Sequence, residues 1–149
     1  NENVNVIEFN CRFGDPETQP IMMRMKDDLY DLCISAIQGR LEGQSIGFES
    51  NTAISVVMAS GGYPGKYEEG IEISGIERAN RLGKVFHAGT KEVGGKVLTA
   101  GGRVLGVTAM GESVSEAQAI AYKMVDQINF TGAYCRRDIG YRAIEREPN

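Results

Sequence analysis

The most constraining feature of this chain is a strict alternation of apolar and polar residues close to its first residue. From Ile7 to Arg12 the sequence reads I-E-F-N-C-R. Successive side chains of a β-strand point to opposite faces of the sheet. A strand over residues 4–12 therefore has an apolar face that suits burial and a polar face that carries Glu8, Asn10 and Arg12.

This polar face has two interpretations. The carboxylate of Glu8 and the amide oxygen of Asn10 are the oxygen donors that Mg²⁺ binds, commonly together with substrate phosphates. Arg12 adds a planar fork of N–H donors that fits a carboxylate or a phosphate. The same alternation is typical of an edge strand whose polar face is simply hydrated. The pattern alone leaves both interpretations open.

A turn signal follows the strand. Gly14 tolerates unusual backbone angles and Pro16 fixes its own, so Asp15 and Glu17 are expected in a tight loop at the end of the strand. Together with the polar face, this loop gathers three carboxylates and an arginine around one spot, which favours a chemical role.

The next residues predict two helices and a linker. A helix begins within Pro20 to Met25, and Asp28 is the predicted N-cap of a second helix. The apolar stripe of that second helix consists of Leu29, Leu32, Cys33, Ala36 and Ile37. Residues 41–52 are rich in Gly, Ser, Glu and Asn and read as a linker. We therefore expect two domains, residues 1–50 and 51–149.

The second domain has a β-rich pattern followed by a helix. Short apolar or β-branched runs predict strands over residues 53–59, 71–74, 84–88, 96–99 and 103–109. Gly94-Gly95 and Gly101-Gly102 lie where two-residue hairpin turns would. Ser113 and Glu116 form a capping box that opens a helix with an apolar core face. The expected fold class is α+β, with an antiparallel β meander or barrel-like sheet and packed helices.

Composition narrows the class of partner. The net charge is −4 and the isoelectric point about 5.1, so nucleic acid and anionic membranes are not expected as partners. No run approaches the ~18 apolar residues that a membrane span needs, and no charged-then-apolar leader opens the chain. Cytoplasmic residence is the expectation.

Cysteine and histidine usage argues against several kinds of site. Cys11, Cys33 and Cys135 are odd in number and widely separated, so they predict neither a disulfide framework nor a metal site, and we expect them to be small buried residues. His87 is the only histidine, which excludes a multi-histidine metal site and favours a structural role.

Three downstream motifs have both structural and functional interpretations. Residues 61–65, G-G-Y-P-G, match no phosphate-binding glycine pattern and are better explained as a turn. Lys91 either reaches a phosphate or solvates a hairpin. Arg136 and Arg137 form either an anion clamp or surface ion pairs, and sequence chemistry alone favours the surface interpretation.

Residues 8–19, E-F-N-C-R-F-G-D-P-E-T-Q, resemble the end of the ATP-grasp domain of the phosphoribosylamine–glycine ligases. The resemblance continues in order through residues 57–65, 85–91, 101–105 and 136–143 and covers essentially all 149 residues. Members of this family are much longer, and their N-terminal domain and ATP-binding loop have no counterpart here. The resemblance thus implies a C-terminal remnant of an ATP-grasp domain followed by the ligase C-terminal domain.

The resemblance also implies a reaction and roles for particular residues. The reaction joins glycine to 5-phosphoribosylamine with ATP as co-substrate, in purine biosynthesis, and needs the missing N-terminal part of the enzyme. Mg²⁺ or Mn²⁺ would be held by Glu8 and Asn10, and Arg12 would stabilise the transferring phosphoryl group. The implied substrate-binding residues are Asp15, Glu17, Lys91, Arg136 and Arg137.

Two other classes of function stay open from the sequence. One is a different ATP-grasp ligase or carboxylase that shares E-x-N-x-R but uses another acceptor. The other is a non-catalytic interaction module, which the absence of an ATP-binding half would explain.

Overall fold

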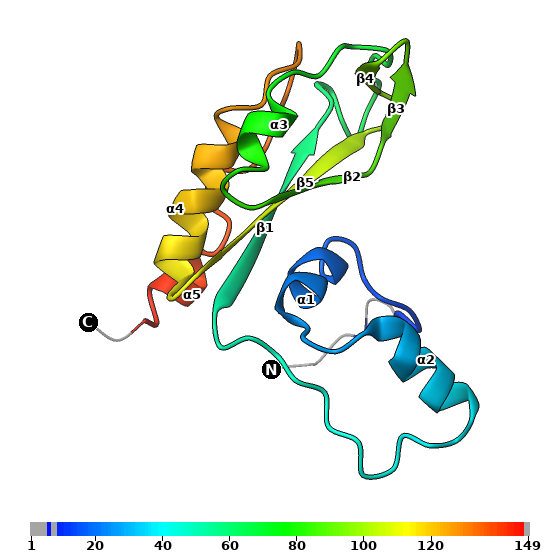
Figure 1. Ribbon diagram of the computed structural model, residues 1–149. Coiled ribbons are helices and arrows are strands. Elements are labelled where there is room, and N and C mark those ends of the chain that lie inside the picture. Colours follow the sequence, from blue (N-terminus) through cyan, green and yellow to red (C-terminus); the bar gives the residue numbers. More distant parts are fainter. Residues whose placement is uncertain (1–5, 7–8, 148–149) are drawn as a thin grey trace.

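The computed structural model describes residues 6 and 9–147 and shows an antiparallel sheet between helices (Figure 1). The helices are α1 (Thr18–Arg24), α2 (Leu29–Ile37), α3 (Ile76–Ala79), α4 (Val114–Val125) and α5 (Tyr141–Ile144). The strands are β1 (Thr52–Ala59), β2 (Lys84–His87), β3 (Thr90–Val93), β4 (Lys96–Thr99) and β5 (Arg103–Gly111). The α+β class with antiparallel sheets is confirmed.

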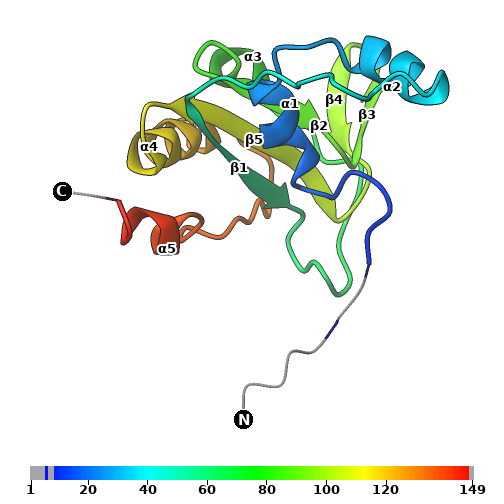
Figure 2. The same ribbon diagram turned by 90° about the horizontal axis from the view of Figure 1, so that it is seen from below.

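The central strand of the main sheet is β5. It pairs with β1 on one side and β2 on the other, in the order β1-β5-β2, with Val107 opposite both Val56 and Val85. Helix α4 packs on one face of β1 and β5, and α1 packs on the other (Figures 1 and 2). Because both faces are covered, every residue of β5 between Val104 and Ala109 is buried.

The core lies between this sheet and α4. Alternate residues of β1 point toward α4, and the buried positions of the helix are Ala117, Ala121, Met124 and Val125. The predicted cap is confirmed, since the Ser113 hydroxyl accepts from the Glu116 amide at 3.1 Å. The Glu116 carboxylate in turn accepts from the Glu112 amide at 2.7 Å. Side-chain capping therefore fixes the start of the helix that covers the core.

The strand predictions are partly wrong. Residues 71–74 form no strand, because Glu72 and Ser74 make single bridges to different partners, Leu98 and Asn129, and build no ladder. Conversely, the polar residues of β3 form a strand that the sequence did not predict. The Gly94-Gly95 turn, with both φ angles positive, folds β3 onto β4 as a separate two-stranded sheet.

Gly101 and Gly102 do not form the expected hairpin turn. They link β4 to β5, which lie in different sheets and do not pair with each other. The strand order of the main sheet is consequently not sequential, and β5 inserts between β1 and β2 instead of following β4 in a meander.

The first third of the chain differs from its sequence expectation. The helix after the turn and the Asp28 cap are confirmed, since the Asp28 carboxylate accepts from the Tyr30 amide at 2.8 Å. The described part of the expected strand over residues 4–12, residues 6 and 9–12, has no strand structure. A strand needs a ladder partner, and no described segment pairs with these residues. Glu8 and Ile7 lie outside the described residues.

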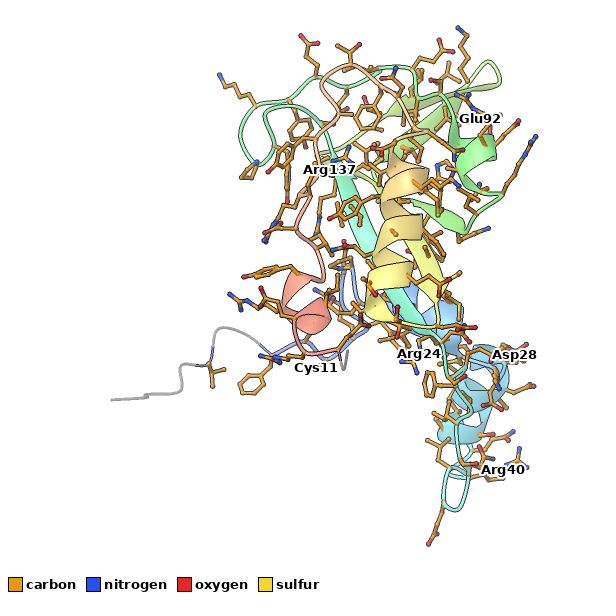
Figure 3. All side chains as sticks on the ribbon, turned by 90° about the vertical axis from the view of Figure 1, so that its left-hand side faces the viewer. Cys11, Arg24, Asp28, Arg40, Glu92 and Arg137 are labelled. Atoms are coloured by element: carbon orange, nitrogen blue, oxygen red, sulfur yellow. The ribbon has the colours of Figure 1, made fainter. Side chains whose placement is uncertain are left out.

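The apolar stripe of α2 is not buried in this chain. Ile37 is 82% exposed, and no described residue before Asn51 falls in the buried class. The expectation of buried cysteines is wrong for Cys11 and Cys33, which are exposed, whereas Cys135 is half-buried. Figure 3 shows that the segment from Asp28 to Arg40 projects from the rest of the molecule, so its side chains have few neighbours.

Within the described part of the chain, none of the helices is long and apolar enough to cross a membrane. The assignment of residues 1–50 and 51–149 to separate domains stays a prediction. In the structure, α1 from the first of these segments packs directly on the sheet of the second.

Replacement of Leu105 by Ala tests whether β5 forms the core. This side chain is 1% exposed, so Leu105→Ala should lower the free energy of unfolding by about 2–5 kcal/mol through lost contacts and a cavity. Leu82 is 38% exposed, and Leu82→Ala, the matched control, should cost less than about 1 kcal/mol. Urea unfolding followed by circular dichroism measures both; equal losses would contradict this core assignment.

Candidate functional site

The candidate site is a cavity of about 210 Å³ on the face of β1 that points away from α4. Segments from four parts of the chain meet there: the loop before α1, strand β1, the start of β5 and the loop that leads to α5. The lining residues are Pro16, Ser55, Val57, Ala59, Tyr63, Arg103, Tyr134, Cys135, Arg136 and Ile139. Most of them are apolar or aromatic, with two arginines among them, which is the usual composition of a small-molecule site.

Asp15 joins the N-terminal loop to this cavity. Its carboxylate pairs with a terminal nitrogen of Arg103 at 3.1 Å, and both side chains are about half exposed. The neighbouring Pro16 lines the cavity itself. Glu17 occupies the N-cap position of α1, and its carboxylate folds back over Gly14. The predicted tight loop is thus confirmed, and it presents Asp15 to the start of β5.

The residues 61–65 form one wall of the cavity. They make the turn predicted from the sequence, with the Tyr63 amide bonding the Ser60 carbonyl and the Gly65 amide bonding the Gly62 carbonyl. Ser60 anchors this turn, because its hydroxyl donates to the Gly101 carbonyl at 2.9 Å. A Cβ on Gly102 would lie 2.2 Å from the Tyr63 ring. Only glycine at position 102 lets the ring reach the cavity.

The opposite wall is held by α4. The Tyr122 hydroxyl donates to the Arg136 carbonyl at 3.0 Å and accepts from the Ile139 amide at 2.9 Å. One turn earlier on the same helix, the Gln118 amide donates to the Ile139 carbonyl at 2.6 Å. Burial is the main cause that raises the pKa of Tyr122, which keeps the phenol protonated for these bonds. The backbone that carries Arg136 is therefore fixed by the helix.

The two adjacent arginines diverge. Arg136 lines the cavity and donates from Nε and Nη2 to both oxygens of Asp138, at 2.9 and 2.7 Å. Arg137 instead pairs with Asp126 at 2.7 Å and lies over the Tyr122 ring. The predicted surface ion pairs are present, yet one of the two guanidinium groups also borders a cavity.

Lys91 is not among the residues that line this cavity. It lies on β3, in the two-stranded sheet, where Figure 3 shows its neighbour Glu92 well apart from Arg137. Nearby, the His87 ring bonds the Thr90 hydroxyl at 3.0 Å, a local contact between β2 and β3.

The residues of the expected polar strand are only partly described. Glu8 lies outside the described residues, whereas Asn10 and Arg12 are exposed, and Arg12 donates to the Phe13 carbonyl at 2.8 Å. Among the described residues no three His, Cys, Asp or Glu side chains lie together as a metal site would require. The donor chemistry of Glu8 and Asn10 still fits a hard cation, so the metal site stays a prediction.

Sequence reasoning missed three lining residues, Tyr63, Arg103 and Tyr134. Arg103 belongs to a run, G-G-R-V-L, that carries the family resemblance, but no local pattern links it to Asp15, 88 positions earlier in the chain. Only the packing of the N-terminal loop against β5 brings these two charges together.

The ion pair at the cavity rim can be tested by titration. Hydrogen bonding from Arg136 is the main cause that lowers the pKa of Asp138. An aspartate with a depressed folded-state pKa contributes stability above its unfolded pKa and loses that contribution as the pH falls through the folded pKa. NMR titration should give Asp138 a pKa below the ordinary aspartate value. Arg136→Gln should return it to that value, whereas Lys96→Gln, which breaks a different exposed pair, should not. An unchanged pKa in Arg136→Gln would contradict this geometry.

Comparison with known proteins places this chain in a family. Residues 53–142 match the family model described as phosphoribosylglycinamide synthetase, C domain. A phosphoribosylamine–glycine ligase of Vibrio cholerae is 57% identical over 95% of this chain and 33% of its own length. The enzyme of that name from Salmonella typhimurium is 55% identical over 99% of this chain and 35% of its own length. The chain thus spans about a third of the length of the curated relatives it matches.

A solved structure agrees with the fold. The crystal structure of phosphoribosylamine–glycine ligase from Thermotoga maritima superposes with a TM-score of 0.70 and 34% sequence identity, covering 89% of this chain and 32% of that chain. The resemblance predicted from the sequence is confirmed by both kinds of comparison. The chain belongs to the phosphoribosylglycinamide synthetase C-domain family.

Proposed function

We propose that this chain forms part of the active site of a phosphoribosylamine–glycine ligase. The observation that carries this proposal is the identity of 55–57% with curated ligases across 95–99% of the chain. The cavity supports it, because the loop with Asp15 and the loop with Arg136 meet there. The enzyme would join glycine to 5-phosphoribosylamine with ATP as co-substrate, in purine biosynthesis and in the cytoplasm.

The reaction takes place in two steps. An oxygen of the glycine carboxylate attacks the γ-phosphorus of ATP, which gives glycyl phosphate and releases ADP. The amine nitrogen of 5-phosphoribosylamine then attacks the carbonyl carbon, phosphate departs, and the nitrogen loses a proton to give glycinamide ribonucleotide. Such chemistry depends mainly on positioning and on stabilisation of negative charge.

On this proposal Arg12 stabilises the transferring phosphoryl group, because its guanidinium is a planar, permanently charged donor. Glu8 and Asn10 would hold Mg²⁺ or Mn²⁺, an ion that neutralises phosphate charge when it is bound. The exposed position of Arg12 and its single described bond to the Phe13 carbonyl leave it accessible to a ligand.

The acceptor would lie on the side of Asp15 and Glu17, whose carboxylates suit an amine. Basic residues would bind its phosphate, and the sequence-derived set for this role is Lys91, Arg136 and Arg137. The cavity geometry supports Arg136 more strongly than the other two, since only Arg136 of the three lines it.

We further propose that the first 50 residues pack against the part of the enzyme that the longer relatives have and this chain does not cover. The exposed fractions support this: 86% for Phe9, 70% for Tyr30 and 82% for Ile37. Large apolar side chains grouped on one surface usually mark an interface. This contact would complete the ATP-binding half of the site.

A chimera tests the proposed activity. This chain should replace the matching third of the Vibrio cholerae ligase with ligation retained within about 10-fold, since 57% identity preserves the packing surfaces. The 149-residue chain alone should give no glycinamide ribonucleotide. The chimera with Arg12→Ala is the matched control and should lose activity by at least about 10²-fold. A folded but inactive chimera, or turnover by the chain alone, would overturn the proposal.

The proposed metal ligand can be separated from the proposed phosphate ligand in the same chimera. Glu8→Gln should raise the magnesium concentration needed for half-maximal rate by at least about 10-fold, because it removes an anionic donor. Arg136→Ala should leave that concentration nearly unchanged and raise the KM of the acceptor instead. Steady-state rates at varied magnesium measure both, and equal magnesium dependence would contradict Glu8 as a ligand.

A further inference from the structure

Arg103 and Arg136 come from distant parts of the chain and line the same cavity. Arg103 is the first residue of β5, and Arg136 lies in the loop that α4 holds in place. Neither arginine is buried, so each can reach a ligand at the rim.

We propose that Arg103 and Arg136 together bind the phosphate of a phosphorylated sugar whose ring lies in this cavity. The inference rests on the proposed function, and it deepens it by assigning Arg103, which the sequence reasoning left out, as a phosphate ligand. It also removes Lys91 and Arg137 from the phosphate site, because neither lines the cavity.

The guanidinium groups are held ready but not saturated. Asp15 accepts from one terminal nitrogen of Arg103, and Asp138 accepts from Nε and Nη2 of Arg136. A guanidinium carries five N–H donors, so each arginine can bond a phosphate oxygen while it keeps its carboxylate partner. These partners fix the orientation of both side chains before the ligand arrives, which lowers the entropy cost of binding.

The remaining lining selects the body of the ligand. A volume of about 210 Å³ is below the ~300–1,000 Å³ of drug-sized sites and suits a compact metabolite better than a nucleotide. Val57, Ala59 and Ile139 offer an apolar floor, and Tyr63 and Tyr134 offer rings for the C–H face of a sugar. The Ser55 hydroxyl lies among them as a polar group for a sugar hydroxyl.

The charge balance at the rim excludes a plain anion site. Two arginines face two carboxylates, Asp15 and Asp138, so the rim has no net charge. Inorganic phosphate therefore gains little from long-range attraction, and affinity must come from directed bonds together with contacts to the ring. A phosphorylated pentose satisfies both requirements, and free ribose satisfies only the second.

The test is a titration of the 149-residue chain with ribose 5-phosphate, followed by amide chemical shifts in NMR. Shifts should centre on the cavity, and ribose or inorganic phosphate should bind at least 10-fold more weakly. Arg103→Gln and Arg136→Gln should each weaken ribose 5-phosphate binding by about 10-fold or more, the usual effect of a lost charge-assisted bond. Lys96→Gln is the matched control, since Lys96 also pairs with an exposed carboxylate, Glu72 at 2.7 Å, and it should change affinity less than twofold.

Folding and shape are controlled separately. Circular dichroism and urea unfolding should show every variant folded, because these ion pairs are exposed and contribute little to stability. Val57→Phe fills the cavity without a change of charge and should also abolish binding.

Several results would overturn the inference: absence of binding to the unaltered chain, equal affinity for inorganic phosphate, or a loss in Lys91→Gln or Arg137→Gln as large as in Arg103→Gln. Failure of the proposed function would be seen instead as an inactive chimera, whether or not the isolated chain binds ribose 5-phosphate.

Discussion

The double pairing of β5 is the interaction on which the rest of the structure depends. This strand donates to and accepts from both β1 and β2, and its covered faces bring α4 and α1 into one molecule. Its first residue, Arg103, reaches the candidate cavity, and its last leads directly into the capped start of α4. Both the core and the site therefore depend on one central strand.

The cavity shows how a rigid framework positions mobile charges. Its walls are fixed by backbone hydrogen bonds, including those from the Tyr122 hydroxyl and from Ser60 to the β4–β5 link. Its charged groups, in contrast, are exposed ion pairs, which typically contribute less than about 1 kcal/mol each to stability. Their value is geometric, because each carboxylate holds an arginine in an orientation that a phosphate can use.

Local sequence patterns predicted the parts of the site that depend on neighbours in the chain. The turn at Asp15 and Glu17, the turn at residues 61–65 and the capping box at Ser113 all follow from short-range backbone chemistry. The expected strand over residues 4–12 was wrong for its described residues, since a strand needs a partner that no local pattern supplies. The same limit explains why residues 71–74 make only isolated bridges.

The sequence by itself determined the α+β class, the helix starts, the family and the candidate residues, because propensity, capping and motif spacing are encoded locally. The tertiary structure alone decided the strand order β1-β5-β2, the separation of Arg136 from Arg137 and the pairing of Arg103 with Asp15. These features depend on contacts between residues far apart in the chain, where burial and close packing select one arrangement among many with the same local pattern.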